Sequence, residues 1–451
     1  MGQVIKSSSK CHIDILTDDA LIIIFSFLTL YERLMVMRVS KRCHRILSNP
    51  QAWTHVDFWQ QQLTRNKLTA SRYSKTWIFP DDKESVLDFL KKYTSGSLKS
   101  IYLKVVSKDI LTHLKKNCGN LEIISFISAN DPVDSADISD FLSRNDPADT
   151  SDIYLSFPEI IPLPKTIKVC EVSWFSFAKN GEKQWENLMM CFAKCPNLRR
   201  LILHGIILTS EVCMALSASK VTELSQLSFL NMRVAGGGNH NSSQLNTALI
   251  SLYNLTKITS FRMSTDDDLD SSQRWLNLNR FLCAITGKWQ DLRCLSLIGI
   301  QALSCQTFAL MTSALTQLQI LELHGQSITD ENISLIAKHL KKLTTLKLTD
   351  GIYTPIGISM LGGHPSIEKL YLLQNNQVQQ SPEWLLAVYD VILSLPKITY
   401  VKLIGYRVIS LHAKEQIPKV TRDVQIEVEN SEIRFEEIEE TVLRQEQVLL
   451  D

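Results

Sequence analysis

The chain has 451 residues, of which 45% are hydrophobic, enough apolar material for two or three ordinary domains or one elongated domain. Its 48 basic residues balance 47 acidic residues, so it lacks the general positive charge of a protein that binds nucleic acid or an acidic membrane. Ten scattered cysteines without a CxxC pair favour a reducing compartment, cytoplasmic or nuclear, over a disulfide-linked extracellular fold.

Residues 1–12 are expected to be a disordered N-terminus, and the first structural unit is expected at 13–55. Between Ala20 and Leu28 only Ser26 is polar, so a helix here is hydrophobic on every face and needs cover on both sides. The run has nine residues, about half of the roughly 20 that cross a bilayer, which excludes a transmembrane helix.

Two shorter helices are expected after this run. One covers 31–39, and the other covers 40–47 and is stopped by Asn49-Pro50. About 40 residues cannot bury enough apolar surface to be stable alone, so the unit should dock on the rest of the chain, on another protein, or on both. The side that carries Leu34, Ile46 and Trp53 is expected to rest on the region that follows.

This unit resembles an F-box in the spacing of its residues, which is Leu16-x-Asp18-Asp19-x-Leu21-x-x-Ile24-Phe25-x-x-Leu28, then Arg33-Leu34, Arg38-Val39-x-x-x-Cys43-x-x-Ile46 and Trp53. Thr17 stands where that family commonly has a proline, Ile23 where it has a charge, and Cys43 where it has a tryptophan. The alternative is an ordinary helical cap for the downstream domain.

The resemblance implies a three-helix unit that binds the S-phase kinase-associated adaptor protein, which links it to a cullin scaffold. It assigns adaptor binding to a set of apolar residues, namely Leu16, Leu21, Ile24, Phe25, Leu28 and Val39.

Residues 56–97 are expected to be a linker or the N-terminal cap of a solenoid, and 98–430 carry a repeated frame, L-x-x-L-x-L. The clearest copies begin at Leu198, Leu292, Leu318, Leu343, Ile367 and Ile398, and weaker copies begin at Leu98, Leu121, Ile167, Leu224 and Ile258. Most spacings between copies lie near the length of one leucine-rich repeat.

The frame has a physical cause. In L-x-L both apolar side chains lie on one face of a short strand, which cannot bury that face alone. Between copies the chain has helical patterns, as where Thr329 precedes Ile333, Ile336 and Leu340. The predicted fold class is therefore α/β: a small all-α three-helix F-box followed by a curved leucine-rich-repeat solenoid, with parallel strands on the concave side and helices on the convex side.

The solenoid resembles ribonuclease-inhibitor and cysteine-containing leucine-rich repeats, the latter in Cys118-Gly-Asn-Leu121 and Cys195-Pro-Asn-Leu198. Three segments depart from the repeat. An acidic insertion is expected at 128–162, a flexible Gly/Asn/Ser loop at 235–243, and an acidic helix or cap at 431–451.

No catalytic constellation is present in the sequence, and no cofactor or metal is expected. Cys191 and Cys195 have helical spacing, but no histidine lies within eight residues of them. His204 and His324 both follow L-x-L directly, so their recurrence is explained by the repeat.

Substrate binding is expected on the concave strands. The assigned residues are Arg200, His204, Glu322, His324, Lys347, Lys369, Tyr371, Tyr400 and Lys402. Lys347, Lys369 and Lys402 fall one per repeat and are predicted to form a basic column in register, which favours an acidic or phosphorylated protein partner.

The joined architecture implies, by resemblance, a non-catalytic substrate receptor of an SCF-type ubiquitin ligase, with no nucleic-acid or membrane partner. The alternative is a leucine-rich scaffold for protein interactions with no role in ubiquitination.

Overall fold

The computed structural model describes residues 12–58, 83–103, 107–126, 163–173, 189–192, 194–218, 221–234, 249–265, 278–299, 303–324, 328–349, 351–373, 382–404 and 424–429. The chain divides into two compact units, residues 1–229 and 230–451. The predicted acidic insertion (128–162), the Gly/Asn/Ser loop (235–243) and the acidic C-terminus (431–451) lie outside the described residues, as does the N-terminal segment before His12.

Three helices open the first unit, and each begins at a hydroxyl-bearing cap. They are α1 (Asp18–Ser26), α2 (Leu30–Val36) and α3 (Lys41–Leu47), preceded by a 3-10 turn (His12–Ile15) and followed by a second one, η2 (Pro50–Trp53). The side chains of Thr17, Thr29 and Ser40 accept backbone hydrogen bonds from the first turns of these helices. The three-helix prediction is confirmed, and Thr17 works as a helix cap where the family commonly has a proline.

The helical domain is joined to the repeats by a short strand and an aromatic cluster. Strand β1 (His55–Asp57) pairs in parallel with β2 (Ser100–Leu103). Trp53 lies 5.1 Å from Phe89 and 5.5 Å from Tyr93, measured between ring centroids, and both partners belong to α5 (Lys83–Tyr93). Trp53 therefore packs against the region that follows the helical domain, as predicted for this residue.

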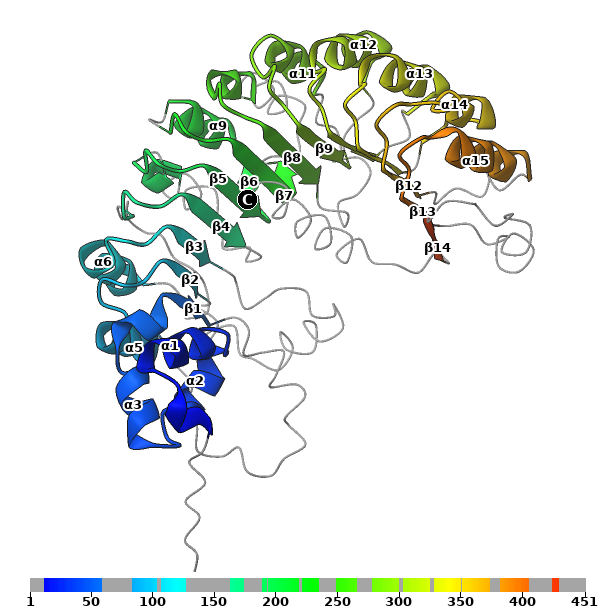
Figure 1. The fold of residues 1–451 in the computed structure, drawn as a ribbon. Helices are drawn as coiled ribbons and strands as arrows, with labels where there is room; N and C mark the ends of the chain where they lie inside the picture. The colour runs from blue at the N-terminus through cyan, green and yellow to red at the C-terminus, as the bar shows by residue number, and fades with distance from the viewer. Residues whose placement is uncertain are drawn as a thin grey trace, which may run out of the picture. The chain divides into compact units, whose positions relative to one another are not determined.

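The remaining first unit consists of parallel strands with helices against one face. In sheet order the strands are β1, β2, β3 (Ile123–Phe126), β4 (Val169–Ser173) and β5 (Arg200–His204), and the helices are α5, α6 (Lys108–Asn117) and α9 (Ser210–Ser217). Figure 1 shows α6 and α9 on the same side of these strands. A two-residue strand, β6 (Ile207–Leu208), follows β5, and β7 (Gln226–Val234) crosses the boundary between the units.

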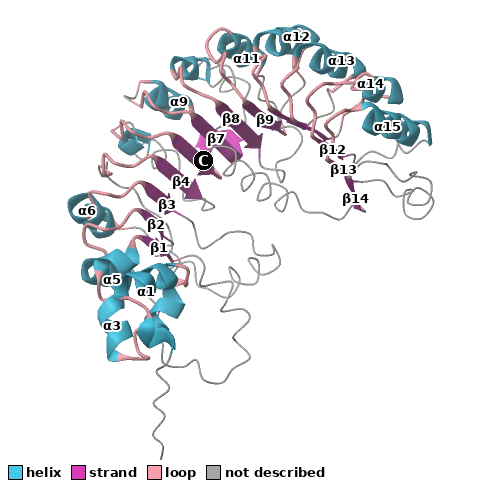
Figure 2. Cartoon of the chain, viewed as in Figure 1, coloured by secondary structure: helices cyan, strands magenta, loops and turns pink. Residues whose placement is uncertain are grey.

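The second unit repeats this arrangement more regularly. Its parallel strands are β8 (Ser260–Thr265), β9 (Cys294–Ile298), β10 (Ile320–His324), β11 (Thr345–Thr349), β12 (Lys369–Leu373), β13 (Tyr400–Ile404) and β14 (Gln425–Glu429). The helical elements are η4 (Leu252–Asn254), α11 (Asn279–Thr286), α12 (Cys305–Ala314), α13 (Asp330–His339), α14 (Pro355–Ser359) and α15 (Pro382–Ser394). Helices α11 to α15 cover the outer side of an arc whose inner side is formed by the strands (Figure 2).

All eleven predicted copies of the repeat frame contain a strand, so the solenoid prediction is confirmed. In β10 the leucines of L-x-L, Leu321 and Leu323, are buried against the helices, while Glu322 points to the opposite side of the sheet, which we call the inner face. The helix after β10 begins at Thr329 as predicted, in a capping box with Asn332.

Strand β1 and helix α5 lie at the edge of, or within, the region 56–97 that was predicted as a linker or cap. Strand β14 lies inside the predicted repeat region 98–430, after its last recognised copy. Within the described part of the chain, no helix is long and apolar enough to cross a membrane.

Candidate functional site

The helical domain has a charged residue at its centre. Arg33 of α2 is buried and donates hydrogen bonds to four backbone carbonyls, those of Ser26 (2.7 Å), Leu28 (2.8 Å), Ala52 (3.0 Å) and His55 (3.1 Å). Its guanidinium also lies 5.6 Å from the centre of the Trp53 ring. Burial lowers the pKa of Arg33. One side chain thus ties the end of α1 to the turn that enters β1.

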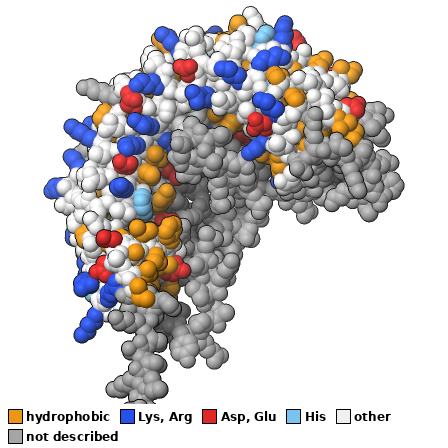
Figure 3. All heavy atoms as spheres, in the orientation of Figure 1, with side chains coloured by type: hydrophobic (Ala, Val, Ile, Leu, Met, Phe, Trp, Pro, Cys, Tyr) orange, Lys and Arg blue, Asp and Glu red, His pale blue; other side chains and the backbone are white. Residues whose placement is uncertain are grey.

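The outside of the same domain is unusually apolar. Fifteen large hydrophobic residues are exposed in the described part of the chain, and eight of them lie between residues 13 and 39. These eight, which we call the apolar surface, are Ile13, Ile15, Leu16, Ile23, Ile24, Phe27, Met35 and Val39. Figure 3 shows hydrophobic side chains gathered over the N-terminal helices. Concentrated exposed apolar residues mark an interaction site in a soluble domain.

The structure separates the predicted adaptor-binding residues into two groups. Leu16, Ile24 and Val39 are exposed on the apolar surface, with Val39 at 76%, and Leu28 is half-buried. By contrast, Leu21 (1% exposed) and Phe25 (3%) point into the domain interior, where a docked partner does not reach them.

Sequence reasoning missed two of the most exposed positions. Phe27 is 84% exposed and Ile23 is 60% exposed, although both lie in the run that the sequence identified as apolar on every face. A pattern without polar positions does not indicate which side of the helix faces inward. One signal did indicate exposure at Ile23, namely that the F-box family commonly has a charged residue at this position.

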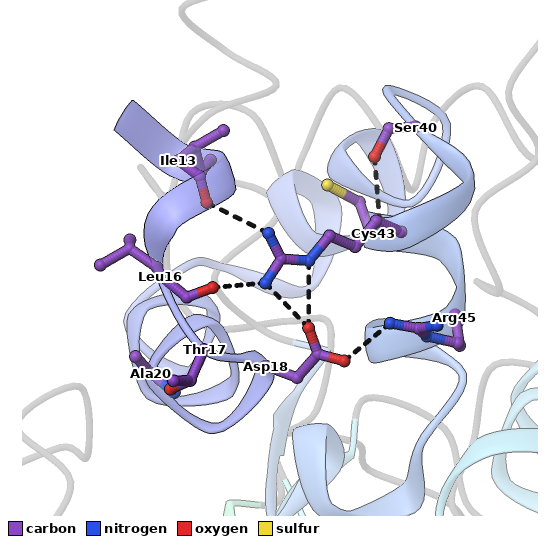
Figure 4. A network of polar contacts seen from close by, with 9 residues as sticks. Ile13, Leu16, Thr17, Asp18, Ala20, Ser40, Cys43 and Arg45 are labelled. Atoms are coloured by element: carbon purple, nitrogen blue, oxygen red, sulfur yellow. Dashed lines mark hydrogen bonds and ion pairs between the residues drawn. The ribbon is translucent and has the colours of Figure 1, made fainter. Parts of the chain in front are cut away.

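An ionic network fixes the N-terminal edge of the apolar surface (Figure 4). Asp18 accepts hydrogen bonds from Arg42 Nε (3.0 Å) and Nη2 (2.9 Å), and from Arg45 Nη2 (2.8 Å). Arg42 also donates to the carbonyls of Ile13 (3.3 Å) and Leu16. The hydrogen bond from Arg42, assisted by Arg45, lowers the pKa of Asp18.

The inner face of the first unit carries Arg200 and His204, two of the predicted substrate-binding residues. Both are half-buried; Arg200 donates to the Gln226 side chain, and His204 Nε2 lies 3.4 Å from Glu171 Oε1. Burial and then the charge of Glu171 raise the pKa of Tyr102 on the neighbouring part of this face. The face therefore offers polar and titratable groups held by neighbours.

On the inner face of the second unit, the predicted basic column is wrong in its register. Lys347 is paired across the sheet with Tyr371, and Tyr371 with Lys402. Lys369 instead neighbours Thr345 and Tyr400, two residues earlier along the strands. The error arose because the lysine follows the first buried apolar residue of the strand in β11 (Leu346) and β13 (Val401) but precedes it in β12 (Leu370).

Burial further divides the predicted substrate-binding residues of this unit. Glu322 (5% exposed), Lys347 (7%) and Tyr371 (8%) are buried, and Glu322 forms an ion pair with Lys347 and accepts from Ser296 at 2.8 Å. The half-buried members are His324, Lys369, Tyr400 and Lys402, and the rings of Tyr371 and Tyr400 are 5.3 Å apart.

The charge state of the buried pair follows from two opposing effects. Burial raises the pKa of Glu322, but the charge and hydrogen bond of Lys347, with the charge of Arg262, outweigh it, so the pKa is lowered overall. Glu322 is therefore ionised and holds Lys347 in a buried ion pair.

The cysteines do not form a reactive or metal-binding cluster in the described residues, where no group of three or more His, Cys, Asp or Glu side chains could hold a metal. Cys191 and Cys195 are buried, and burial raises the pKa of Cys195 to about 12, which keeps the thiol protonated.

Comparison with known proteins addresses the helical domain directly. A family model described as F-box-like matches residues 18–59, which identifies this segment as an F-box-like domain. No curated protein sequence matches the chain.

The similar solved structures include two that match at low identity. One is the complex of Rad7 and Elc1 from yeast (12% identity, 91% of this chain and 92% of that chain, TM-score 0.44). The other is the complex of TLR13 with ssRNA13 (14% identity, 75% and 61%, TM-score 0.28).

Proposed function

We propose that this chain is a substrate-recognition subunit of an SCF-type ubiquitin ligase, active in the cytoplasm or nucleus. The observation that carries the proposal is the coincidence of an F-box-like domain at 18–59 with the apolar surface on the same helices. An F-box-like domain implies an adaptor partner, and the apolar surface is where such a partner would be accommodated.

The proposed adaptor is the S-phase kinase-associated adaptor protein, which would bring the cullin scaffold with it. Its contact residues would be the exposed members of the original set, Leu16, Ile24 and Val39, together with Ile23 and Phe27. Leu28 would contribute its exposed half. Leu21 and Phe25 would support these residues from the interior.

The substrate would bind the inner face of the repeats. The half-buried residues Arg200, His204, His324, Lys369, Tyr400 and Lys402 are the proposed contacts. The aromatic and cationic side chains in this set are those that anchor protein interfaces, and they favour an acidic or phosphorylated protein segment.

The chain itself would perform no chemistry. By holding the adaptor with one domain and the substrate with the repeats, it would raise the effective concentration of substrate lysines near a ubiquitin-loaded enzyme carried by the scaffold. This role requires binding surfaces and a link between domain and repeats, and the contacts of Trp53 with Phe89 and Tyr93 of α5 support such a link.

A binding experiment with purified proteins tests the proposal. Phe27→Asp combined with Val39→Asp places two charges on the apolar surface at positions that make little contact within the chain. We expect adaptor affinity to fall at least about 30-fold, the effect of losing a hot spot, with loss of cullin recruitment.

Met214→Asp is the matched control, because Met214 is a 49% exposed apolar residue on α9 of the same unit. It should retain both partners. If the unaltered chain does not bind the adaptor, or if the double variant binds as tightly as the control, the ligase proposal is refuted and the scaffold alternative remains.

A further inference from the structure

The N-terminal edge of the apolar surface does not belong to a helix that could hold it in place. Ile13, Ile15 and Leu16 lie in the 3-10 turn and the residue after it, and all three side chains are exposed. A single 3-10 turn gains little stability from its own hydrogen bonds, and these side chains are not packed in a core. Something outside the turn must therefore fix its position.

Arg42 is placed to do this. It projects from α3 and uses its planar group of N–H donors on the carbonyls of Ile13 and Leu16 and on the carboxylate of Asp18, the first residue of α1. Figure 4 shows the labelled residues Ile13, Leu16 and Asp18 within this network of hydrogen bonds. One side chain thus links the turn, the start of α1 and α3 in a defined arrangement.

The proline commonly found in this loop of the family restricts the backbone through its ring. This chain has Thr17 at that position, and the Thr17 hydroxyl caps α1 by accepting a hydrogen bond from Ala20 N (3.2 Å). The cap fixes the start of the helix but does not reach back to Ile13 or Ile15. The hydrogen bonds from Arg42 therefore restrict the backbone of this turn in place of a proline ring.

We propose that Arg42 is a positioning residue for the adaptor: it holds Ile13, Ile15 and Leu16 in line with the exposed residues of α1 without itself contacting the partner. The inference rests on the proposed function, since it assumes that the apolar surface is the adaptor site. A lysine cannot replace this arginine, because an ammonium is a point donor and cannot span three acceptors in one plane.

Arg42→Lys tests the proposal because it keeps the charge and removes the planar fork. In the full-length chain we expect affinity for purified S-phase kinase-associated adaptor to fall roughly ten-fold, since binding must now order the turn. Amide exchange at 13–17 should become faster in the unbound chain, while exchange in α2 and the repeats stays unchanged. Arg45→Lys is the control, because Arg45 also contacts Asp18 but its side chain is 72% exposed. This substitution should change adaptor affinity less than about two-fold.

A double-mutant cycle separates positioning from direct contact. If Arg42 acts through the turn, Arg42→Lys should have no further effect on affinity in a chain that already carries Ile15→Ala and Leu16→Ala. Additive losses would mean that Arg42 touches the adaptor, and would overturn the inference, as would unchanged affinity or unchanged exchange in the single variant.

Failure here and failure of the proposed function are distinguishable. If Arg42→Lys binds normally while Phe27→Asp with Val39→Asp does not, the positioning role is refuted and the ligase proposal stands. If the unaltered chain does not bind the adaptor, both fail, and faster exchange at 13–17 would then show only that Arg42 orders the turn.

Discussion

Replacing Arg33 by methionine tests what holds the F-box-like domain together. Methionine fills much of the space of the arginine stem and tolerates a helix, so the change removes chiefly the guanidinium. The carbonyls of Ser26, Leu28, Ala52 and His55 then lose a donor at one stroke. The stacking of the guanidinium on Trp53 is lost as well.

The expected cost is about 3 to 5 kcal/mol of domain stability. A hydrogen bond to a charged donor contributes about 1.5 to 3 kcal/mol. The net stabilisation from the four bonds is smaller than their sum, because removing the guanidinium from water is itself costly, as the lowered pKa of Arg33 indicates. Each buried carbonyl left without a donor costs about 1 to 3 kcal/mol, so two or more unsatisfied carbonyls account for the expected loss, and a domain this small has little stability in reserve.

Native-state amide exchange measures this locally. We expect residues 18–58 of Arg33→Met to lose protection while α6 and strands β3 to β5 keep theirs, because the domain opens without the repeats. Arg45→Met removes an arginine whose side chain is 72% exposed and should cost less than about 1 kcal/mol. Protection in α1 to α3 of Arg33→Met within about 1 kcal/mol of the unaltered chain would contradict this account.

Two further predictions concern the second unit. Because the folded-state pKa of Glu322 lies below its ordinary 4.5, its ionised form stabilises the fold fully above that pH, and the contribution is lost as pH falls through 4.5 to the lowered value. Glu322→Gln leaves the charge of Lys347 uncompensated and should lower the free energy of unfolding by about 3 to 5 kcal/mol at neutral pH. Denaturant titrations should show this difference from the unaltered chain shrinking as the pH falls, and a difference that does not change with pH would contradict the prediction. Gly299 has φ +66°, and an added Cβ would overlap the Thr265 hydroxyl, so Gly299→Ala should cost about 1 to 3 kcal/mol by thermal unfolding. Gly287→Ala, which meets only ordinary contacts, should stay within about 0.5 kcal/mol, and equal losses for the two would refute the steric reason.

The repeat strands could be predicted because their signal is local. In L-x-x-L-x-L the buried positions are fixed by alternation within six residues, and the leading residue, such as Leu318 or Leu343, is fully buried in each unit's regular repeats. Strand β1 escaped because its three residues contain one apolar side chain, Val56, and its existence depends on pairing with β2. Pairing with a distant partner leaves no pattern in so short a segment.

Side-chain exposure was the part that sequence could not supply. Glu322 and Lys347 occupy strand positions that alternation assigns to the inner face, and they do lie there, yet both are buried because they pair with each other. Burial of such a position depends on neighbouring strands, whose relative register the sequence does not state. Lys369 is a different case, because its place before Leu370 in the repeat frame already puts it two residues earlier than Lys347, and the pairing of β11 with β12 follows that frame.

The distribution of polar and apolar residues in the F-box-like domain is not the one that would make an isolated domain most stable. Its interior is organised around an arginine that binds carbonyls, while large apolar side chains such as Phe27 and Val39 remain outside. Burying one such side chain would stabilise an isolated domain by about 1.5 to 3 kcal/mol, without the desolvation cost that a buried guanidinium carries. Arg33 cross-links the interior and Trp53 packs against α5, so the exposed apolar residues are not part of the core. The turn before α1 shows the same division: the hydrogen bonds of Arg42 hold its backbone, while the apolar side chains of Ile13, Ile15 and Leu16 remain exposed.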